Sequence, residues 1–127
     1  MDKIRVKIGK LEILAEITEE NPETAKRVFS QLPIEGTAQR WGEEIYFLVG
    51  FDIPLEAGRE ECEPGEIGFW PGGPALAIFF GKTPVSTGER PKAYSPCNFF
   101  ARLVGDWSKE ALEEVRDGEK IVLSKAK

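Results

Sequence analysis

Histidine is absent from the 127 residues, so few side chains remain that could perform chemistry. This absence excludes Ser-His-Asp and Cys-His catalytic systems and removes the commonest protein ligand of transition metals. Two cysteines remain, Cys62 among glutamates and Cys97 at the start of an apolar run. Negative neighbours and burial both disfavour the thiolate, so we expect unreactive thiols, no metal and no cofactor. Any reaction must use carboxylates, Lys, Arg, Tyr or Cys, or avoid proton transfer.

Two adjacent carboxylates, Glu43 and Glu44, have the residue type of an acid–base pair. Neighbouring side chains of a strand point to opposite faces, so we expect that these two do not face one substrate. The glycines within residues 65–73 do not form a phosphate-binding loop, because no Gly-Lys-Ser/Thr follows at the required spacing. The sequence therefore indicates neither paired carboxylate catalysis nor nucleotide binding.

Rotation about a prolyl peptide bond is a reaction that this residue set could support. It needs no nucleophile or proton shuttle, only an apolar pocket and a donor that stabilises the twisted amide. Arg40 is the best candidate donor and Arg102 the next, although either could be an ordinary solvated arginine on a strand.

The overall composition limits the classes of protein to consider. A length of 127 residues with 41% apolar residues predicts a single domain, residues 1–127, with one core. The net charge of −5 without a basic cluster argues against nucleic acid as a partner. No segment is apolar enough to predict a membrane span or a signal peptide, so we expect a cytoplasmic protein. Abundant charge with little Asn, Gln, Met or Cys is typical of heat-adapted organisms.

The elements that position these candidate side chains are predicted to be mostly β-strands. Alternating or continuous apolar runs predict eight strands, at residues 3–8, 11–17, 37–41, 44–51, 67–70, 75–80, 98–104 and 119–125. Helices are expected near 22–32 and 108–116, with Asn21 and Ser108 as caps. Residues 52–64 and 82–96 are rich in charge, Pro or Gly and predict long loops. Eight short antiparallel strands in a small domain favour a closed β-barrel, which has no edges.

The centre of this arrangement is residues 65–84, GEIGFWPGGPALAIFFGKTP. Two short apolar runs surround Pro-Gly-Gly-Pro, which predicts a buried hairpin with a tight turn. Its aromatic side chains are expected to fill the core, and one face could also line a binding pocket.

The same segment carries a resemblance to a known family. PGEIGFWPGGPALAIFFGKTP at 64–84 and WGEEIYF at 41–47 resemble the cyclophilin-like family of archaeal and thermophilic bacterial proteins. NFFARLVG at 98–105 and DGEKIVL at 117–123 fit the same family, so the similarity covers nearly the whole chain. The resemblance implies a cyclophilin-type barrel of eight antiparallel strands with a helix at each end.

The resemblance also implies a groove. True cyclophilins are peptidyl-prolyl isomerases, but their Phe-His-Arg and Gln-Gly-Gly-Asp strings are absent here. By similarity the groove would be lined by Arg40, Trp41, Tyr46, Phe79, Phe80 and Asn98. Phe80 would be its floor, because its counterpart of a paired Phe lines the groove in cyclophilins. Arg40 would be the candidate catalytic donor, and Asn98 would occupy the position of the later histidine.

Three functions remain open at this point. The first is binding of a peptide or small ligand in the aromatic groove, with little or no catalysis. The second is peptidyl-prolyl cis-trans isomerisation of a proline-containing peptide, with a rearranged donor. The third is an unrelated enzyme on the same barrel, because a fold alone does not determine activity.

Overall fold

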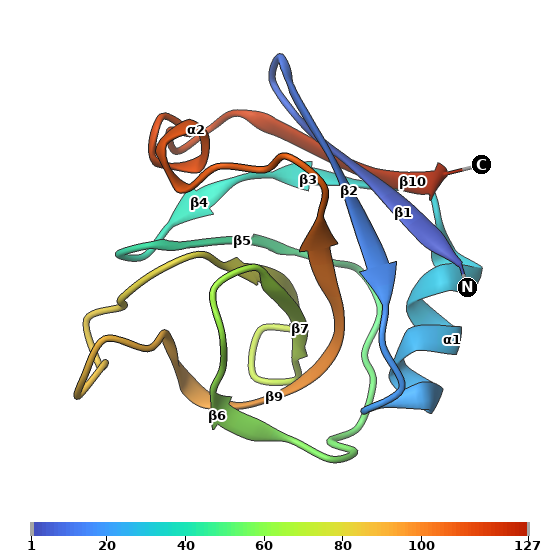
Figure 1. Ribbon diagram of the computed structural model, residues 1–127. Coiled ribbons are helices and arrows are strands. Elements are labelled where there is room, and N and C mark those ends of the chain that lie inside the picture. The colour runs from blue at the N-terminus through green and yellow to red at the C-terminus, as the bar shows by residue number, and fades with distance from the viewer. Residues whose placement is uncertain (1, 127) are drawn as a thin grey trace.

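Residues 2–126, which the computed structural model describes, form ten strands and two short helices (Figure 1). The strands are β1 (Lys3–Ile8), β2 (Leu11–Ile17), β3 (Ile34–Thr37), β4 (Gln39–Arg40), β5 (Glu44–Leu48), β6 (Arg59–Glu61), β7 (Glu66–Trp70), β8 (Ala75–Phe79), β9 (Lys92–Val104) and β10 (Lys120–Ala126). The helices are α1 (Pro22–Gln31) and α2 (Lys109–Glu113). All strand pairs are antiparallel.

Strand β1 joins the two ends of the chain into one sheet. It pairs with β2, which follows it directly, and with β10, which lies beside it in Figure 1. The β1–β10 register runs from Lys3 opposite Ala126 to Ile8 opposite Ile121. The inward side chains of β1 alternate with charged ones, and Ile4, Val6 and Ile8 are buried.

The expectation of a closed eight-stranded barrel is wrong. The ten strands form an open sheet in the order β3-β10-β1-β2-β9-β7-β8-β5-β4, with β6 paired to β9. Residues 37–41, expected as one strand, divide around Ala38 between the two ends of this order. Ala38 stays with the β10 end, donating to the Glu119 carbonyl at 2.7 Å and accepting from the Gly118 amide at 2.9 Å.

Between β3 and β5 the sheet is joined by side-chain packing and not by the backbone hydrogen bonds that would close a barrel. Gly36 of β3 lies against the ring of Phe47 of β5, so close that an added Cβ would be 2.5 Å from the ring. Within residues 2–126 the end strands β3 and β4 share no strand pairing. The sheet therefore curves far enough to bring its ends together through side chains without closing through hydrogen bonds.

Two strands lie in segments that were expected to be loops. β6 lies within residues 52–64 and pairs with β9, with Arg59 opposite Cys97. β9 begins at Lys92 rather than at residue 98, so it takes over the end of the other expected loop. The sequence of β6, Arg-Glu-Glu, has no apolar alternation, and β9 contains Pro96, so neither segment has the pattern of a strand.

The helices lie where the sequence predicts them, but the start of α1 is capped differently. Ser108 accepts a hydrogen bond from the Ala111 amide at 3.1 Å and caps α2 as expected. At α1 the first amides instead bind the carboxylate of Glu56, with the Thr24 amide at 3.0 Å. Asn21 makes no cap hydrogen bond, because its side chain accepts from the Ala57 amide at 2.6 Å. Among residues 2–126 no helix is long and apolar enough to cross a membrane.

Alternation along the strands divides the apolar side chains into two clusters. In β8, Leu76 and Ile78 face the larger one, the main core, whereas Ala77 and Phe79 face the other way. The second cluster consists of Cys62, Ala77, Phe79, Ala93, Cys97 and Phe99, with Tyr46 and Trp70 packed against it. The sheet is therefore covered by apolar side chains on both faces in this region.

A β-bulge in β9 allows this strand to contribute side chains to both apolar clusters. Its register against β7 places Ala101 opposite Ile67 but Phe99 opposite Gly68, so Phe100 is an extra residue. As a result Phe100 and Ala101 both reach the main core, and Phe99 turns to the second cluster.

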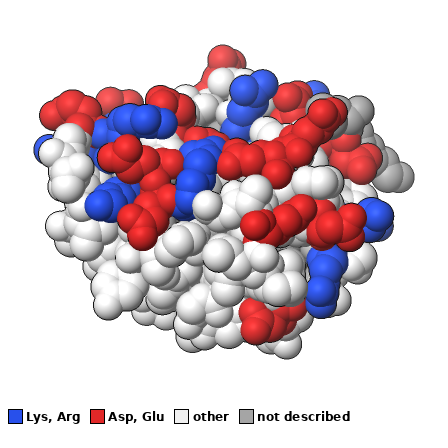
Figure 2. Space-filling view, turned by 90° about the horizontal axis from the view of Figure 1, so that it is seen from below, with Lys and Arg blue, Asp and Glu red and all other residues white. Residues whose placement is uncertain are grey.

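Charges of both signs lie close together on the face of Figure 2, which is the underside of Figure 1. A broad area at the lower left of that view carries no Lys, Arg, Asp or Glu. Close pairs such as Arg59 with Glu20 at 2.6 Å and Arg90 with Glu63 at 2.9 Å bring opposite charges together.

Candidate functional site

The second cluster opens into a cavity of about 290 Å³ on the side of the sheet away from the main core. Strands β5, β7, β8 and β9 and the turn after β4 supply its lining: Trp41, Glu44, Tyr46, Trp70, Phe79, Ala93, Tyr94 and Cys97. Five of these eight side chains are aromatic and one is a carboxyl.

The rim of the cavity is formed by three aromatic rings. Tyr94 lies edge-to-face against both Trp41 and Trp70, with ring centroids 6.3 Å apart in each pair. The Tyr94 side chain is 71% exposed although it is large and aromatic. An aromatic ring held open to solvent at a cavity mouth is available for contact with a ligand.

Trp70 is held in place from two sides. Its indole N–H donates a hydrogen bond to the Ser95 hydroxyl. Gly72, in the turn between β7 and β8, lies so close to the indole that an added Cβ would be 2.6 Å from it. The Pro-Gly-Gly-Pro turn therefore requires glycine at residue 72 because the chain passes over the Trp70 ring.

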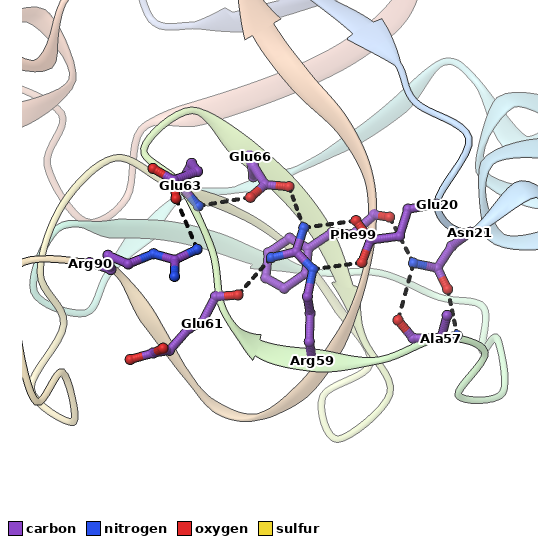
Figure 3. A network of polar contacts seen from close by, with 9 residues as sticks. All are labelled: Glu20, Asn21, Ala57, Arg59, Glu61, Glu63, Glu66, Arg90 and Phe99. Carbon is purple, nitrogen blue, oxygen red and sulfur yellow. Dashed lines mark hydrogen bonds and ion pairs between the residues drawn. The ribbon is translucent and has the colours of Figure 1, made fainter.

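The floor of the cavity rests on a second layer of aromatic and charged groups. Phe79 lines the cavity and packs on Phe99 at a centroid distance of 5.6 Å. The Arg59 guanidinium lies 4.5 Å from the centroid of the Phe99 ring (Figure 3). This cation–π contact supports the floor from behind.

Arg59 is fixed in turn by carboxylates from separate parts of the chain (Figure 3). It donates to both oxygens of Glu20, at 2.6 and 2.7 Å, and to Glu66 at 2.6 Å. A further hydrogen bond of 2.6 Å reaches the Glu61 carbonyl. The hydrogen bonds to Glu20 are the main reason why the guanidinium pKa is raised. The network therefore holds a permanent charge behind Phe99.

Glu44 is the carboxyl that faces the cavity. The residue is 8% exposed, and burial raises its pKa to about 8. The polar groups beside it are bonded elsewhere: the Tyr46 hydroxyl donates to Gln39 at 3.3 Å and the Cys97 thiol to the Ser95 carbonyl at 3.7 Å. Within residues 2–126 no hydrogen bond or ion pair reaches the Glu44 side chain, and no Lys or Arg lines the cavity.

The two cysteines are free and buried, and neither has the environment of a nucleophile. Burial, with a smaller contribution from Glu44, raises the pKa of Cys97 to about 12. Burial likewise raises the pKa of Cys62 above its ordinary value. Both thiols therefore stay protonated at neutral pH, as their sequence surroundings indicate. Among residues 2–126, no three His, Cys, Asp or Glu side chains gather in a way that could hold a metal ion.

Of the six residues expected to form the groove, the structure brings three to the cavity: Trp41, Tyr46 and Phe79. Phe80 is not the floor, because it is 1% exposed and belongs to the main core. Successive strand side chains alternate in direction, so only one member of the pair can face the cavity, and it is Phe79.

Arg40 does not point into the cavity either. Its guanidinium lies 5.2 Å from the centroid of the Phe80 ring and donates to three backbone carbonyls. These are Gly42 at 2.9 and 3.1 Å, Glu113 at 3.1 Å and Val115 at 3.0 Å. Arg40 therefore connects the turn before β5 to the end of α2, and four of its N–H donors are occupied.

Asn98 is a structural residue in this fold. It is 0% exposed, and its amide group donates to the Thr24 hydroxyl and to the Pro54 carbonyl, both at 3.0 Å. Its side-chain oxygen accepts from the Glu56 amide at 2.8 Å. These bonds fasten α1 and residues 54–56 to β9, and Asn98 does not line the cavity.

Sequence reasoning missed Glu44, Trp70, Tyr94, Ala93 and Cys97 as lining residues. A period of two along β5 from Tyr46 would have placed Glu44 on the same face. The prediction that Glu43 and Glu44 face apart is confirmed, since Glu43 binds Lys109 at 3.2 Å on the outside. Tyr94 lies in a segment expected to be a loop, so no alternation pointed to it.

Comparisons with known proteins agree with this architecture. A family model described as Cyclophilin-like matches residues 2–124. The solution structure of the hypothetical protein AF2241 from Archaeoglobus fulgidus is similar, with 35% identity and a TM-score of 0.83, covering 98% of this chain and 95% of that one.

A second solved structure is similar in fold alone. McbB in complex with tryptophan has 16% identity and a TM-score of 0.71, and the match covers 95% of this chain and 44% of McbB. A comparison with curated proteins finds no match. The match over residues 2–124, with 35% identity to AF2241 over nearly the full length of both chains, shows that this protein belongs to the cyclophilin-like family.

Proposed function

We propose that this protein binds a small ligand, or one side chain of a peptide, in the aromatic cavity, with little or no catalysis. The observation that supports this is the cavity itself, about 290 Å³ and lined by five aromatic rings and one carboxyl. Binding pockets are mostly apolar with a few placed polar groups, and this volume lies at the lower end of their usual range. The ligand therefore fits as one ring with a short arm.

The positions of the donors favour binding over prolyl isomerisation. An isomerase needs a fixed donor where the amide loses planarity. Arg40 binds three backbone carbonyls, and Trp70 donates to Ser95. Among the described residues that line the cavity, none is Lys or Arg. The arginine expected as the donor is therefore bound elsewhere, and the site offers mainly aromatic contact area.

Nuclear magnetic resonance of the ¹⁵N-labelled protein tests the proposal. Indole, a neutral probe suggested by the rings and by the tryptophan bound to McbB, is titrated alongside a proline-containing tetrapeptide. We expect at least one probe to shift the Trp70 indole N–H and the amides of Tyr46 and Tyr94. The amide of Lys26, on α1 and outside the cavity, serves as an internal reference.

Two matched variants locate the binding. Tyr94→Ala removes a rim ring that is 71% exposed, and Leu48→Ala removes an apolar side chain that is 57% exposed on β5 outside the cavity. We expect weaker binding for Tyr94→Ala and unchanged binding for Leu48→Ala. Equal losses in both, or no shift at cavity residues with any probe, would contradict the proposal.

A further inference from the structure

We propose that the ligand of this cavity carries a positively charged amine and that Glu44 is the group that receives it. The inference rests on the proposed function, because it names the class of ligand for the same cavity. It is carried by the carboxyl, by the rings around it and by the absence of competing cations among the described lining residues.

Glu44 is a mostly buried residue whose carboxyl faces the cavity and has no partner within residues 2–126. A carboxyl that faces a cavity can complete its hydrogen bonds there, with water in the free protein and with a donor of the ligand when one is bound. Glu44 is 8% exposed, it lines the cavity, and within residues 2–126 no donor reaches its oxygens. The neighbouring donors, the Tyr46 hydroxyl and the Cys97 thiol, are directed to Gln39 and to the Ser95 carbonyl. A ligand donor would complete the hydrogen bonding that the protein leaves open.

The rings around the cavity suit a cation. The faces of Trp and Tyr rings attract ammonium groups, and quaternary or primary amines are bound by cages of such rings. Tyr94 stands at 74° to Trp41 and at 79° to Trp70, so the rim presents ring faces in nearly perpendicular directions. Tyr46 adds a fourth electron-rich ring on β5. An amine that enters between these rings meets the Glu44 carboxyl.

The charges near Glu44 do not oppose this arrangement. The titratable groups that line the cavity with it are Cys97 and Tyr94 on β9 and Tyr46 on its own strand, and none is a cation. Behind Cys97 lies Glu60, whose carboxylate is 3.9 Å from the Lys92 ammonium. An anionic ligand would meet a carboxyl without a compensating charge, whereas an ammonium ion would neutralise it.

The binding step has a defined proton balance. Burial raises the pKa of Glu44 to about 8, so the empty cavity holds a neutral carboxyl at pH 7. An entering ammonium ion stabilises the carboxylate, and the Glu44 proton leaves to solvent as the ion pair forms. Affinity for an amine therefore rises by about tenfold per pH unit below pH 8 and levels off above it.

Three probes of one shape separate charge from size: 2-phenylethylamine, 2-phenylethanol and 3-phenylpropionate. We expect the amine to bind at least about tenfold more tightly than the alcohol at pH 8, and the carboxylate to bind most weakly. Glu44→Gln should lose the preference for the amine and keep the binding of the alcohol. Glu43→Gln is the matched control, because Glu43 faces outward to Lys109, and it should keep the preference.

Calorimetry at pH 7 in phosphate and in Tris supplies a second readout. Wild-type protein should release close to one proton per bound amine, and Glu44→Gln should release none. Equal affinities for the three probes in the wild-type protein would overturn the inference while leaving the binding function intact. Binding by none of the three probes, nor by indole, would overturn both.

Discussion

Two buried polar side chains, Asn98 and Glu44, show how differently this fold treats polar groups. Asn98 is 0% exposed, and all the hydrogen bonds of its amide group go to Thr24, Pro54 and Glu56. Glu44 is 8% exposed, and within residues 2–126 its carboxyl has no partner. The complete set of bonds at Asn98 stabilises the fold, whereas the open set at Glu44 is the kind of feature expected where a ligand binds.

The comparison predicts opposite consequences of mutation, beginning with Asn98. Asn98→Ala leaves the Glu56 amide and the Pro54 carbonyl without partners and removes the bond that the Thr24 hydroxyl accepts, so we expect a loss of about 4 kcal/mol in the free energy of unfolding. Urea denaturation measures it. Arg102→Ala, which removes a side chain that is 60% exposed on the same strand, is the control and should cost less than about 0.5 kcal/mol. A loss below about 1 kcal/mol for Asn98→Ala would contradict the view that the hydrogen bonds of Asn98 stabilise the fold.

Glu44→Gln should stabilise the protein at high pH. The ordinary carboxyl pKa of 4.5 is raised to about 8, so between these values the folded chain holds a proton that the unfolded chain has lost. Stability therefore falls as the pH rises from about 4.5 to 8 and is constant above. Because the cavity admits water, we expect the wild-type protein to lose about 3 kcal/mol more than Glu44→Gln between pH 5 and pH 9. Parallel denaturation midpoints across that range would contradict a buried, unpartnered carboxyl.

Arg40 tests whether an arginine near the cavity acts in structure or in chemistry. Arg40→Met removes hydrogen bonds to three carbonyls and should cost about 2 kcal/mol in stability. In a protease-coupled assay on a proline peptide we expect wild-type activity to be absent or at least about a hundredfold below that of a true cyclophilin. Turnover at the level of a cyclophilin that is lost in Arg40→Met would instead establish an isomerase.

The smallest effect is expected behind the floor of the cavity. Arg59→Met keeps an apolar contact on Phe99 but loses the ion pairs with Glu20 and Glu66, in which Arg59 is 34% exposed. We expect a loss of about 1 kcal/mol at low salt, because ion pairs that remain partly exposed to solvent contribute little. The difference from wild type should shrink in 1 M salt, where such pairs are screened. A loss that salt leaves unchanged would mean that packing on Phe99 carries the effect.

Local patterns predicted much of this architecture. Alternation located β1, β2 and β5, and short continuous apolar runs located β7, β8 and β10. The cap at Ser108 located α2, and the motifs at 41–47 and 64–84 indicated the family. Each of these signals lies within a few residues of chain. Trp41, Tyr46 and Phe79, three of the six residues expected to line a groove, do line the cavity.

The failures all depend on contacts between distant parts of the chain. The division of residues 37–41 at Ala38 is decided by hydrogen bonds to Gly118 and Glu119. β6 is a strand because its backbone pairs with β9, although the sequence Arg-Glu-Glu has no pattern typical of a strand. The choice between Phe79 and Phe80 depends on one residue of register, which similarity to a paired Phe does not determine.

The pairing of β1 with both β2 and β10 has a consequence for the order of folding. During synthesis β1 and β2 can meet early, but β1 waits for its other partner until residues 120–126 have left the ribosome. Until then one edge of β1 remains without a partner and open to association with other chains. Contacts of such long sequence separation also slow folding, to milliseconds or seconds in β-rich domains. The nascent chain is therefore protected from association through this edge of β1 only after β1 has paired with β10.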